Sequence, residues 1–462
     1  MRNIDIKNKI FVNRTLNMNT IKLIGFDMDY TLVTYNVPAF EEKTYSIIKK
    51  KLINDYNYPE EINDFVLDQD FIIRGLVIDT ETGDFLKVNR YGFVRTASHG
   101  TAFLTYEQQK EKYGVKSIDF TDSRYSIVHT MFSKAEGCLF AQLVDYFDKK
   151  EKSPNYKKIY AAVKRCLNNA HMETELKGDV AQYPEKYLLP DKRIVDALLK
   201  FKKFGKKLAL ITNSDYNYSK KVMEYCFGQF IKIPWQKVFD IIVVAANKPT
   251  FFTQNNMFLK VDPETGLLSN YYGPLEWNGI YQGGNANYLE KTFGIDPSEI
   301  LYLGDHILGD VVTLKETIGW RTGLVVQELE EEVPILEKVQ DIHKQISKKM
   351  AEKERLEDIS LDYREKLWLK KDAKVNRQKF DEIKEKMIKL DDELRELISL
   401  SQQGFNKYWG EVMRAGNEVS RFAALVERYA CIYMSGISSL YYYSPYKYFR
   451  SQRRLLAHDP KQ

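Results

Sequence analysis

Short apolar runs, each ending in polar residues, recur through the first two thirds of the chain. They span 21–26, 208–211, 239–246, 300–303 and 320–326. Such near-continuous apolar runs are typical of strands buried on both faces of a parallel sheet. A helical pattern over 194–204, stopped by Gly205, lies between the first two runs. This alternation predicts an α/β fold with a parallel-sheet core.

The alternation is interrupted over residues 37–191. Within this stretch, 76–79 and 82–88 read as a β-hairpin turning at Gly83, and 125–147 and 156–171 have helical apolar spacing. Because the runs on either side belong to one sheet, we expect 37–191 to be an inserted α+β cap domain over the site.

A different pattern begins after residue 328. Apolar residues recur at alternating spacings of three and four among Lys and Glu, at Phe380, Ile383, Met387, Leu390, Leu394 and Leu397, with a second set at Leu336, Val339, Ile342 and Ile346. This heptad pattern predicts a C-terminal helical hairpin within the chain, and an intermolecular coiled coil is the alternative. Residues 405–454 are rich in aromatics, so we expect them to dock back on the protein.

These patterns predict five parts. They are the start of the core (1–36), the inserted cap (37–191), the remainder of the core (192–328), a charged helical hairpin (329–404) and an aromatic C-terminal segment docking on the core (405–462).

Composition limits the function classes. The net charge of +5 over 462 residues gives no electrostatic case for nucleic-acid binding. The four cysteines are far apart and form no metal-type pair. The N-terminal residues have no signal-peptide core and no apolar run is of membrane-spanning length. We therefore expect a cytoplasmic protein with neither nucleic acid nor membrane as a partner.

Two aspartates, Asp27 and Asp29, directly follow the first apolar run. Carboxylates this close repel one another unless a cation or a shared proton holds them together. A strand end is also where open parallel sheets keep their ligands.

Polar residues follow the other runs as well. They are Thr212 and Asn213, then Lys248, and finally Asp305 and Asp310. Together with Asp27 and Asp29 they suit phosphoryl transfer, which needs a nucleophile, an acid/base, a phosphate cradle, a neutralising cation and oxygen ligands for Mg²⁺. Each piece alone also fits a solvated turn or a helix N-cap, and only the combination in this order is specific.

The motifs resemble a known family. Residues 26–32 (FDMDYTL), 211–216 (ITNSDY), 247–249 (NKP) and 304–310 (GDHILGD) look like the four motifs of the haloacid dehalogenase (HAD) superfamily. More narrowly, they resemble the cytosolic purine 5'-nucleotidases that prefer IMP and GMP.

The resemblance implies a Rossmann-like core, a cap domain that closes over the nucleotide, and a Mg²⁺-dependent enzyme that works through an aspartyl-phosphate. Asp27 is then the nucleophile and Asp29 the general acid/base, while Thr212 and Asn213 hold the phosphate and Lys248 bridges it to Asp27. The implied ligands of Mg²⁺ are Asp27, the Asp29 carbonyl, Asp305 and Asp310.

The base-reading segment implied by the resemblance carries Lys164, Asn168 and His171, followed by Lys177. Lys164 and Asn168 stand where family members have Arg and Asp, and Thr101 stands in place of an aromatic. Lys in place of Arg loses bidentate recognition of a purine edge, so the base preference stays open. The alternative for this segment is an exposed polar helix face.

We therefore predict a homo-oligomeric 5'-nucleotidase acting on purine nucleoside monophosphates, with transfer of the phosphoryl group to a nucleoside as a second outcome. The alternatives are a HAD phosphatase of another small phosphomonoester and a catalytically inert coiled-coil scaffold.

Overall fold

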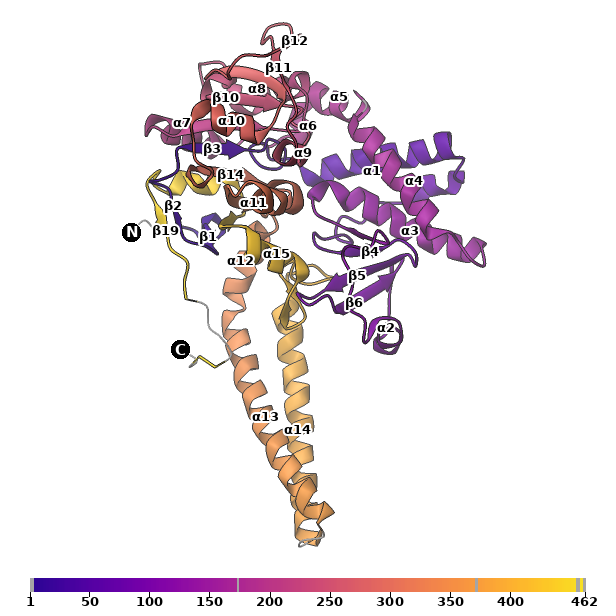
Figure 1. The fold of residues 1–462 in the computed structure, drawn as a ribbon. Helices are drawn as coiled ribbons and strands as arrows, with labels where there is room; N and C mark the ends of the chain where they lie inside the picture. The colour runs from indigo at the N-terminus through magenta and orange to yellow at the C-terminus, as the bar shows by residue number, and fades with distance from the viewer. Residues whose placement is uncertain (1–3, 173, 370–372, 454–457, 460–462) are drawn as a thin grey trace. The chain divides into compact units, whose positions relative to one another are not determined.

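The computed structural model describes residues 4–172, 174–369, 373–453 and 458–459. The chain divides into two compact units, one of residues 1–329 with 412–462 and one of residues 330–411. Figure 1 shows the elements of each unit. Among the described residues, no helix is both long and apolar enough to cross a bilayer. The five-part division, the cytoplasmic location and the homo-oligomer stay predictions.

A ten-stranded sheet forms the centre of the first unit. Its order is β1 (Phe11–Val12), β18 (Ile432–Met434), β15 (Arg321–Val325), β14 (Ile300–Gly304), β3 (Leu23–Phe26), β9 (Lys207–Ile211), β10 (Ile241–Val244), β13 (Gly279–Gly283), β11 (Phe258–Val261) and β12 (Leu268–Asn270). The seven strands from β18 to β13 are parallel, and β1, β11 and β12 add antiparallel edges. This parallel sheet confirms the predicted α/β fold class.

Both faces of the sheet are covered. Side chains alternate along β3 and β9, so that Ile24 and Leu208 belong to one apolar cluster and Leu23 and Ala209 to the other. The surrounding helices are α7 (Lys192–Lys203), α8 (Tyr216–Gly228), α9 (Thr250–Thr253), α10 (Ala286–Phe293), α11 (Thr313–Thr317) and α15 (Arg421–Tyr429). Because β3 lies between β14 and β9, the strand order reverses beside it, and such a reversal opens a ligand crevice at the carboxyl ends of the strands.

The cap is inserted between β3 and β9. Its antiparallel sheet has the order β7 (Ala102–Phe103), β6 (Val94–His99), β5 (Asp84–Val88), β4 (Val77–Asp79) and β8 (Tyr125–Ile127). Its helices are α1 (Val37–Tyr56), α2 (Tyr106–Tyr113), α3 (Lys134–Lys150), α4 (Tyr156–Met172), α5 (Thr174–Gln182) and α6 (Pro184–Tyr187). The predicted turn between β4 and β5 has Gly83 at φ +73°. The predicted helix over 125–147 is wrong in its first part, because residues 125–127 pair with β4 and the helix begins only at Lys134.

Two short pairs complete the first unit: β2 (Leu16–Asn17) with β19 (Tyr448–Phe449), and β16 (Arg414–Ala415) with β17 (Glu418–Val419). The aromatic C-terminal segment therefore does more than dock on a surface, because it also supplies β18 to the central sheet.

A helical hairpin occupies the second unit. α13 (Gln340–Trp368) and α14 (Ala373–Gln402) lie side by side, and α12 (Leu329–Lys338) precedes them (Figure 1). Ile383, Leu390 and Leu394 of the predicted heptad are buried. Ion pairs of Lys349 with Glu393 and of Lys353 with Asp391 also join the two helices. α14 thus pairs with a helix of the same chain, but that helix begins at Gln340, so the predicted partner residues Leu336 and Val339 lie before it.

Candidate active site

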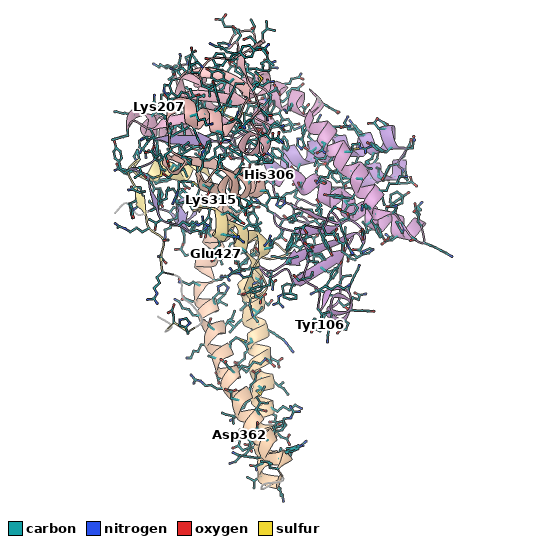
Figure 2. The ribbon with its side chains drawn as sticks, viewed as in Figure 1. Tyr106, Lys207, His306, Lys315, Asp362 and Glu427 are labelled. Carbon is teal, nitrogen blue, oxygen red and sulfur yellow. The ribbon has the colours of Figure 1, made fainter. Side chains whose placement is uncertain are left out.

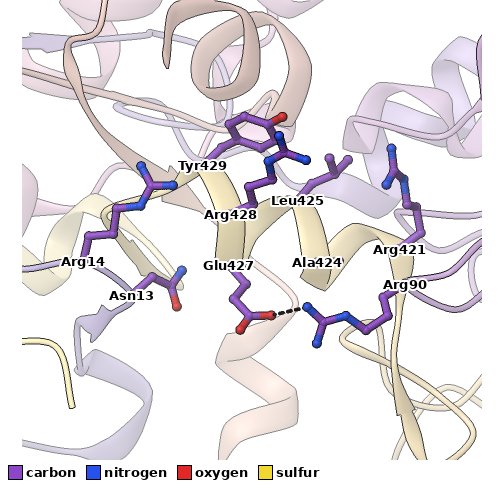
Figure 3. Close-up of a pocket in the computed structure, with 9 residues that line it drawn as sticks. All are labelled: Asn13, Arg14, Arg90, Arg421, Ala424, Leu425, Glu427, Arg428 and Tyr429. Carbon is purple, nitrogen blue, oxygen red and sulfur yellow. Dashed lines mark ion pairs between the residues drawn. The ribbon is translucent and has the colours of Figure 1, made fainter. Parts of the chain in front are cut away.

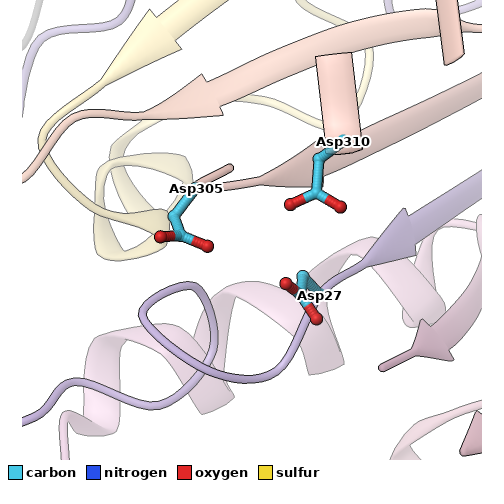
Figure 4. Close-up of side chains that lie close together, drawn as sticks. All are labelled: Asp27, Asp305 and Asp310. Atoms are coloured by element: carbon cyan, nitrogen blue, oxygen red, sulfur yellow. The ribbon is translucent and has the colours of Figure 1, made fainter. Parts of the chain in front are cut away.

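Three aspartates meet at the carboxyl ends of β3 and β14. Oxygen atoms of Asp27, Asp305 and Asp310 lie within 4.8 Å of one another, and all three side chains are buried (Figure 4). Lys248, from the loop after β10, places its Nζ 2.9 Å from Asp27 Oδ1 and 2.8 Å from Asp310 Oδ1. The structure therefore brings together residues that lie up to 283 positions apart in the sequence.

Close backbone approaches help to form this cluster. A Cβ atom at Gly25 would lie 2.7 Å from the Tyr302 ring, and one at Gly304 would lie 2.3 Å from Asp310 Oδ2. Because neither glycine has a Cβ atom, Tyr302 can accept a hydrogen bond from Lys248 Nζ at 2.8 Å and donate one to the Ile211 carbonyl at 2.9 Å. Glycine at these two positions thus leaves room for Tyr302 and Asp310 to contact Lys248.

The cluster carries more negative than positive charge. Burial raises the pKa of Asp27 well above its usual value despite Lys248, and burial together with Asp310 raises the pKa of Asp305 to about 7. Burial also opposes the charge of Lys248, but Asp27 and Asp310 hold its pKa well above the ordinary value. Three buried carboxylates facing one ammonium form an oxygen donor set that fits a divalent cation.

The cap contributes to the same place. Arg74, between α1 and β4, donates from Nη1 to the Asp305 carbonyl at 3.0 Å and pairs with Glu328 at 2.7 Å. Thr130 Oγ1 donates to Asp305 Oδ2 at 3.3 Å. These contacts fix both the backbone and the side chain of Asp305.

Asp29 lies beside the cluster with its own partners. Tyr35 donates to its Oδ1 at 2.5 Å and Ser214 to its Oδ2 at 2.8 Å, while the Tyr35 and Tyr218 hydroxyls are 2.9 Å apart. Burial raises the pKa of Asp29, although the hydrogen bonds from Tyr35 and Ser214 oppose that rise. A carboxyl group with a raised pKa is suited to exchanging protons near neutral pH.

The two polar residues after β9 differ in their contacts. Thr212 is fully buried and its Oγ1 accepts from the Ser214 N–H at 3.1 Å. The Asn213 amide donates to the Lys248 carbonyl at 3.0 Å and accepts from the Lys248 N–H at 2.6 Å. Asn213 thus ties the loop that carries Lys248 to the end of β9.

The predicted base-reading residues of α4 are more dispersed. Lys164 and Asn168 are exposed, and Lys164 Nζ lies 3.8 Å from Glu136 Oε1. Thr101 is bound to Asp145 within the cap. These three residues lie on polar surface and not in the aspartate cluster.

His171 and Lys177 lie closer to the Asp29 network. The His171 ring is 5.2 Å from the Phe132 ring, and burial lowers its pKa to about 4. Lys177 Nζ is 3.2 Å from Asp215 Oδ2 and 5.2 Å from the centre of the Tyr218 ring.

Comparison with known proteins gives the family. The 5' nucleotidase family matches residues 10–461, which is nearly the whole chain. The chain belongs to the 5' nucleotidase family. It is therefore a phosphoric monoester hydrolase, and the predicted family resemblance is confirmed.

Two curated relatives of this nucleotidase are both named 5'-nucleotidase domain-containing protein 2. The rat protein is 28% identical over 97% of this chain and 80% of its own length. The human protein is 28% identical over 97% of this chain and 85% of its own length.

Solved structures were also matched. A predicted phosphoglycolate phosphatase from Haemophilus somnus 129PT (15% identical) and CbbY from Rhodobacter sphaeroides in complex with phosphate (13% identical) each cover 66% of this chain and 86% of their own, at a TM-score of 0.27. A likeness this low supports no argument about this nucleotidase.

Sequence reasoning missed several residues that contact the candidate active site. They are Tyr35, Arg74, Thr130, Ser214 and Tyr302. Ser214 lies inside a quoted motif and Tyr302 inside a predicted strand, so proximity to the motifs was a usable signal for both. Tyr35, Arg74 and Thr130 reach the site only through tertiary packing.

The nucleotidase chain also has a separate cavity of ≈ 480 Å³. Figure 3 shows its lining, which comes from the N-terminal segment, the loop after β5 and α15, and contains Arg14, Arg90, Arg421 and Arg428. Glu427 pairs with Arg90 at 3.5 Å. None of the three clustered aspartates lines this cavity.

Proposed function

We propose that this protein is a Mg²⁺-dependent 5'-nucleotidase that hydrolyses purine nucleoside 5'-monophosphates through an aspartyl-phosphate. The observation that carries the proposal is the buried lysine between two carboxylates, with Lys248 Nζ 2.9 Å from Asp27 Oδ1 and 2.8 Å from Asp310 Oδ1. A lysine in this position opposes the rise that burial causes in the pKa of Asp27, and it offers a positive charge to an incoming phosphate.

In the first step, a carboxylate oxygen of Asp27 attacks phosphorus and the bond from phosphorus to the nucleoside 5'-oxygen breaks. Asp29 gives its proton to that leaving oxygen, and its raised pKa supports this role. In the second step, Asp29 takes a proton from water, the water oxygen attacks phosphorus, and the bond from phosphorus to Asp27 breaks. Phosphate leaves and both aspartates return to their starting states.

Thr212, Asn213 and Lys248 are assigned to the phosphoryl oxygens. Thr212 and Asn213 stand at the end of β9, next to Asp27 at the end of β3, and Asn213 holds the Lys248 backbone in place. Positioned donors of this kind stabilise charge that develops on the transferring group.

Asp27, Asp305, Asp310 and the Asp29 carbonyl are the assigned ligands of Mg²⁺. A divalent ion bound there supplies positive charge that offsets the three carboxylates and the phosphate. The excess of buried carboxylate over Lys248 supports this assignment.

The preference for purine bases is the most specific part of the proposal. Buried polar atoms of Tyr30 and His171 have no hydrogen-bond partner among the described residues, whereas Glu136 Oε1 is ion-paired with Lys164 Nζ at 3.8 Å. Phe132 lies beside the first two, with its ring 4.4 Å from Tyr30 and 5.2 Å from His171. An aromatic face with free buried polar groups suits a heterocyclic base. Lys164, Asn168 and Lys177 are assigned to the outer part of this base site.

Phosphate release from a panel of IMP, GMP, AMP and sugar phosphates, with Mg²⁺ and with EDTA, tests the proposal. We expect Mg²⁺-dependent release led by a purine nucleotide. The Asp196→Asn variant, which alters only an exposed helix pair with Lys192, should keep that activity. If a sugar phosphate is hydrolysed fastest, the proposed nucleotide substrate is wrong, while the proposed phosphatase mechanism still stands.

The same aspartyl-phosphate is open to attack by a nucleoside hydroxyl. Adding inosine to a reaction that uses GMP as the donor should then yield IMP. If GMP is hydrolysed and no IMP forms, phosphotransfer is excluded and hydrolysis remains.

A further inference from the structure

Exposed apolar side chains gather at the end of the hairpin where α13 passes into α14. Trp368 is 83% exposed, Leu369 55%, Val375 54% and Leu361 53%. Leu361 and Trp368 are seven residues apart and therefore share one face of α13. Asp362, labelled in Figure 2, lies at this end of the hairpin. We call these four apolar residues the hairpin tip.

The charge around the hairpin tip is distinct from that of the rest of the hairpin. Segments 361–369 and 374–382 contain five basic and four acidic residues, whereas 340–360 and 383–402 contain nine basic and ten acidic residues. The five basic residues are Arg364, Lys366, Lys374, Arg377 and Lys379. Lys366 is paired with Asp362 at 2.6 Å and Arg377 with Asp381 at 3.3 Å, so this end of the hairpin keeps a small net positive charge.

The lysines lie along apolar surface near the hairpin tip. Lys366 Nζ is 5.1 Å and Lys379 Nζ 5.8 Å from the centre of the Tyr363 ring. Long basic side chains in such a position keep their charged ends in water while their stems cover apolar groups.

We propose that the hairpin tip docks on an anionic lipid surface, with Trp368 and Leu369 entering the headgroup region and the basic residues facing lipid phosphates and carboxylates. Trp is favoured at membrane interfaces, and clustered Lys and Arg are attracted to anionic lipid. This proposal is independent of the nucleotidase chemistry, and it departs from the expectation from the sequence that no membrane is a partner.

The size of the hairpin tip favours a bilayer over a protein partner. Two helix ends side by side cover an area of roughly 10 by 20 Å. A stable protein interface needs about 800 Å² on each partner. A narrow convex end can enter a soft headgroup layer, but it offers a rigid protein too little surface.

Sedimentation of the full chain with lipid vesicles tests the proposal. We expect binding to equimolar phosphatidylcholine and phosphatidylserine, weak binding to phosphatidylcholine alone, and loss of binding as salt is raised. The double variant Trp368→Ala and Leu369→Ala should weaken binding about tenfold or more, and Lys374→Glu at least about fivefold.

The matched control is the double variant Ile388→Ala and Lys389→Glu. It removes an exposed apolar residue (Ile388, 54% exposed) and a basic residue from the same hairpin away from the tip, so binding should fall much less. Thermal unfolding by circular dichroism checks that all variants are folded. Equal binding to both kinds of vesicle, or equal losses in tip and control variants, would overturn the proposal. A lower solution mass of the tip variants would overturn it too, because the tip would then join copies of the chain.

Discussion

Two groups of buried acidic residues in the first unit differ in how their charge is balanced. In the core, Asp27 and Asp310 share one lysine, Lys248. Arg74 and Lys248 act on the charge of Asp305 without an ion pair to its carboxylate among the described residues. In the cap, Asp79 and Asp84 are also fully buried, but each has a dedicated cationic partner.

In the cap, the charges of Asp79 and Asp84 are balanced by basic side chains that contact them. Arg124 donates to Asp79 from Nε at 2.7 Å and from Nη2 at 2.5 Å. Asp84 is bound by Lys112, Tyr113 and His99, with His99 Nδ1 at 2.8 Å. Burial opposes ionisation of Asp84, yet these hydrogen bonds hold its pKa below the ordinary value.

The pKa directions separate the two groups. Burial raises the pKa of Asp27 and of Asp305, whereas the partners of Asp84 lower its pKa. Carboxylates that lack sufficient cations store unfavourable energy, which a bound cation or a substrate with its metal relieves. The comparison teaches that charge imbalance, and not the mere burial of acids, distinguishes the candidate active site from structural support.

The largest expected effect comes from Asp27→Asn. Phosphate release should fall by on the order of 10⁴-fold or more, because the proposed nucleophile is lost. In EDTA the variant should unfold at a higher temperature than the parent, because one uncompensated buried charge is gone. Activity assays and calorimetry measure the two effects. Asp84→Asn is the matched change in the cap, and it should lower the unfolding temperature. A higher unfolding temperature for Asp84→Asn would contradict the proposed difference in charge balance between the two acidic groups.

Asp29→Asn should reduce turnover by about 10²- to 10⁴-fold, the usual contribution of a general acid/base. Mg²⁺ affinity should stay close to that of the parent, because the assigned metal contact of Asp29 is its backbone carbonyl. Isothermal titration with Mg²⁺ and steady-state kinetics separate these effects. Loss of Mg²⁺ binding in a folded variant would contradict the assigned role.

Arg124→Ala should destabilise the cap by about 2 kcal/mol. This expected loss of stability is smaller than that for breaking a fully buried ion pair, because the Arg124 side chain is 30% exposed. Urea unfolding measures the change. The double variant Arg124→Ala and Asp79→Asn should recover part of the lost stability. If it recovers none, the unpaired charge of Asp79 is not the cause of the loss.

The smallest effect concerns pH. The hydrogen bond to Asp84 raises the pKa of His99, so protonated His99 stabilises the cap. This contribution is fully present below the unfolded-state pKa and disappears as pH rises through the folded-state pKa. The unfolding temperature of the parent should therefore fall relative to that of His99→Gln across this range. NMR titration of the His99 ring measures the pKa directly, and an ordinary or lowered value would exclude the effect.

The sequence predicted a large part of the fold from local patterns. Long apolar strands such as Ile300–Gly304 and the turn at Gly83 could be read directly, because burial on two faces and positive φ leave local signals. Short strands could not. Ile432–Met434 joins the sheet through pairing with β15, and Tyr125–Ile127 through pairing with β4, so distant partners decided both.

The sequence by itself determined which chemical groups follow each strand. Asp27, Asp29, Lys248, Asp305 and Asp310 were identifiable because a parallel sheet opens all its strand ends at one edge. Only the tertiary structure decided their partners: Tyr302 beneath Lys248, Tyr35 on Asp29, and Arg74 on the Asp305 carbonyl. Such partners come from segments with unrelated local patterns, and charge balance depends on distances that no linear spacing encodes.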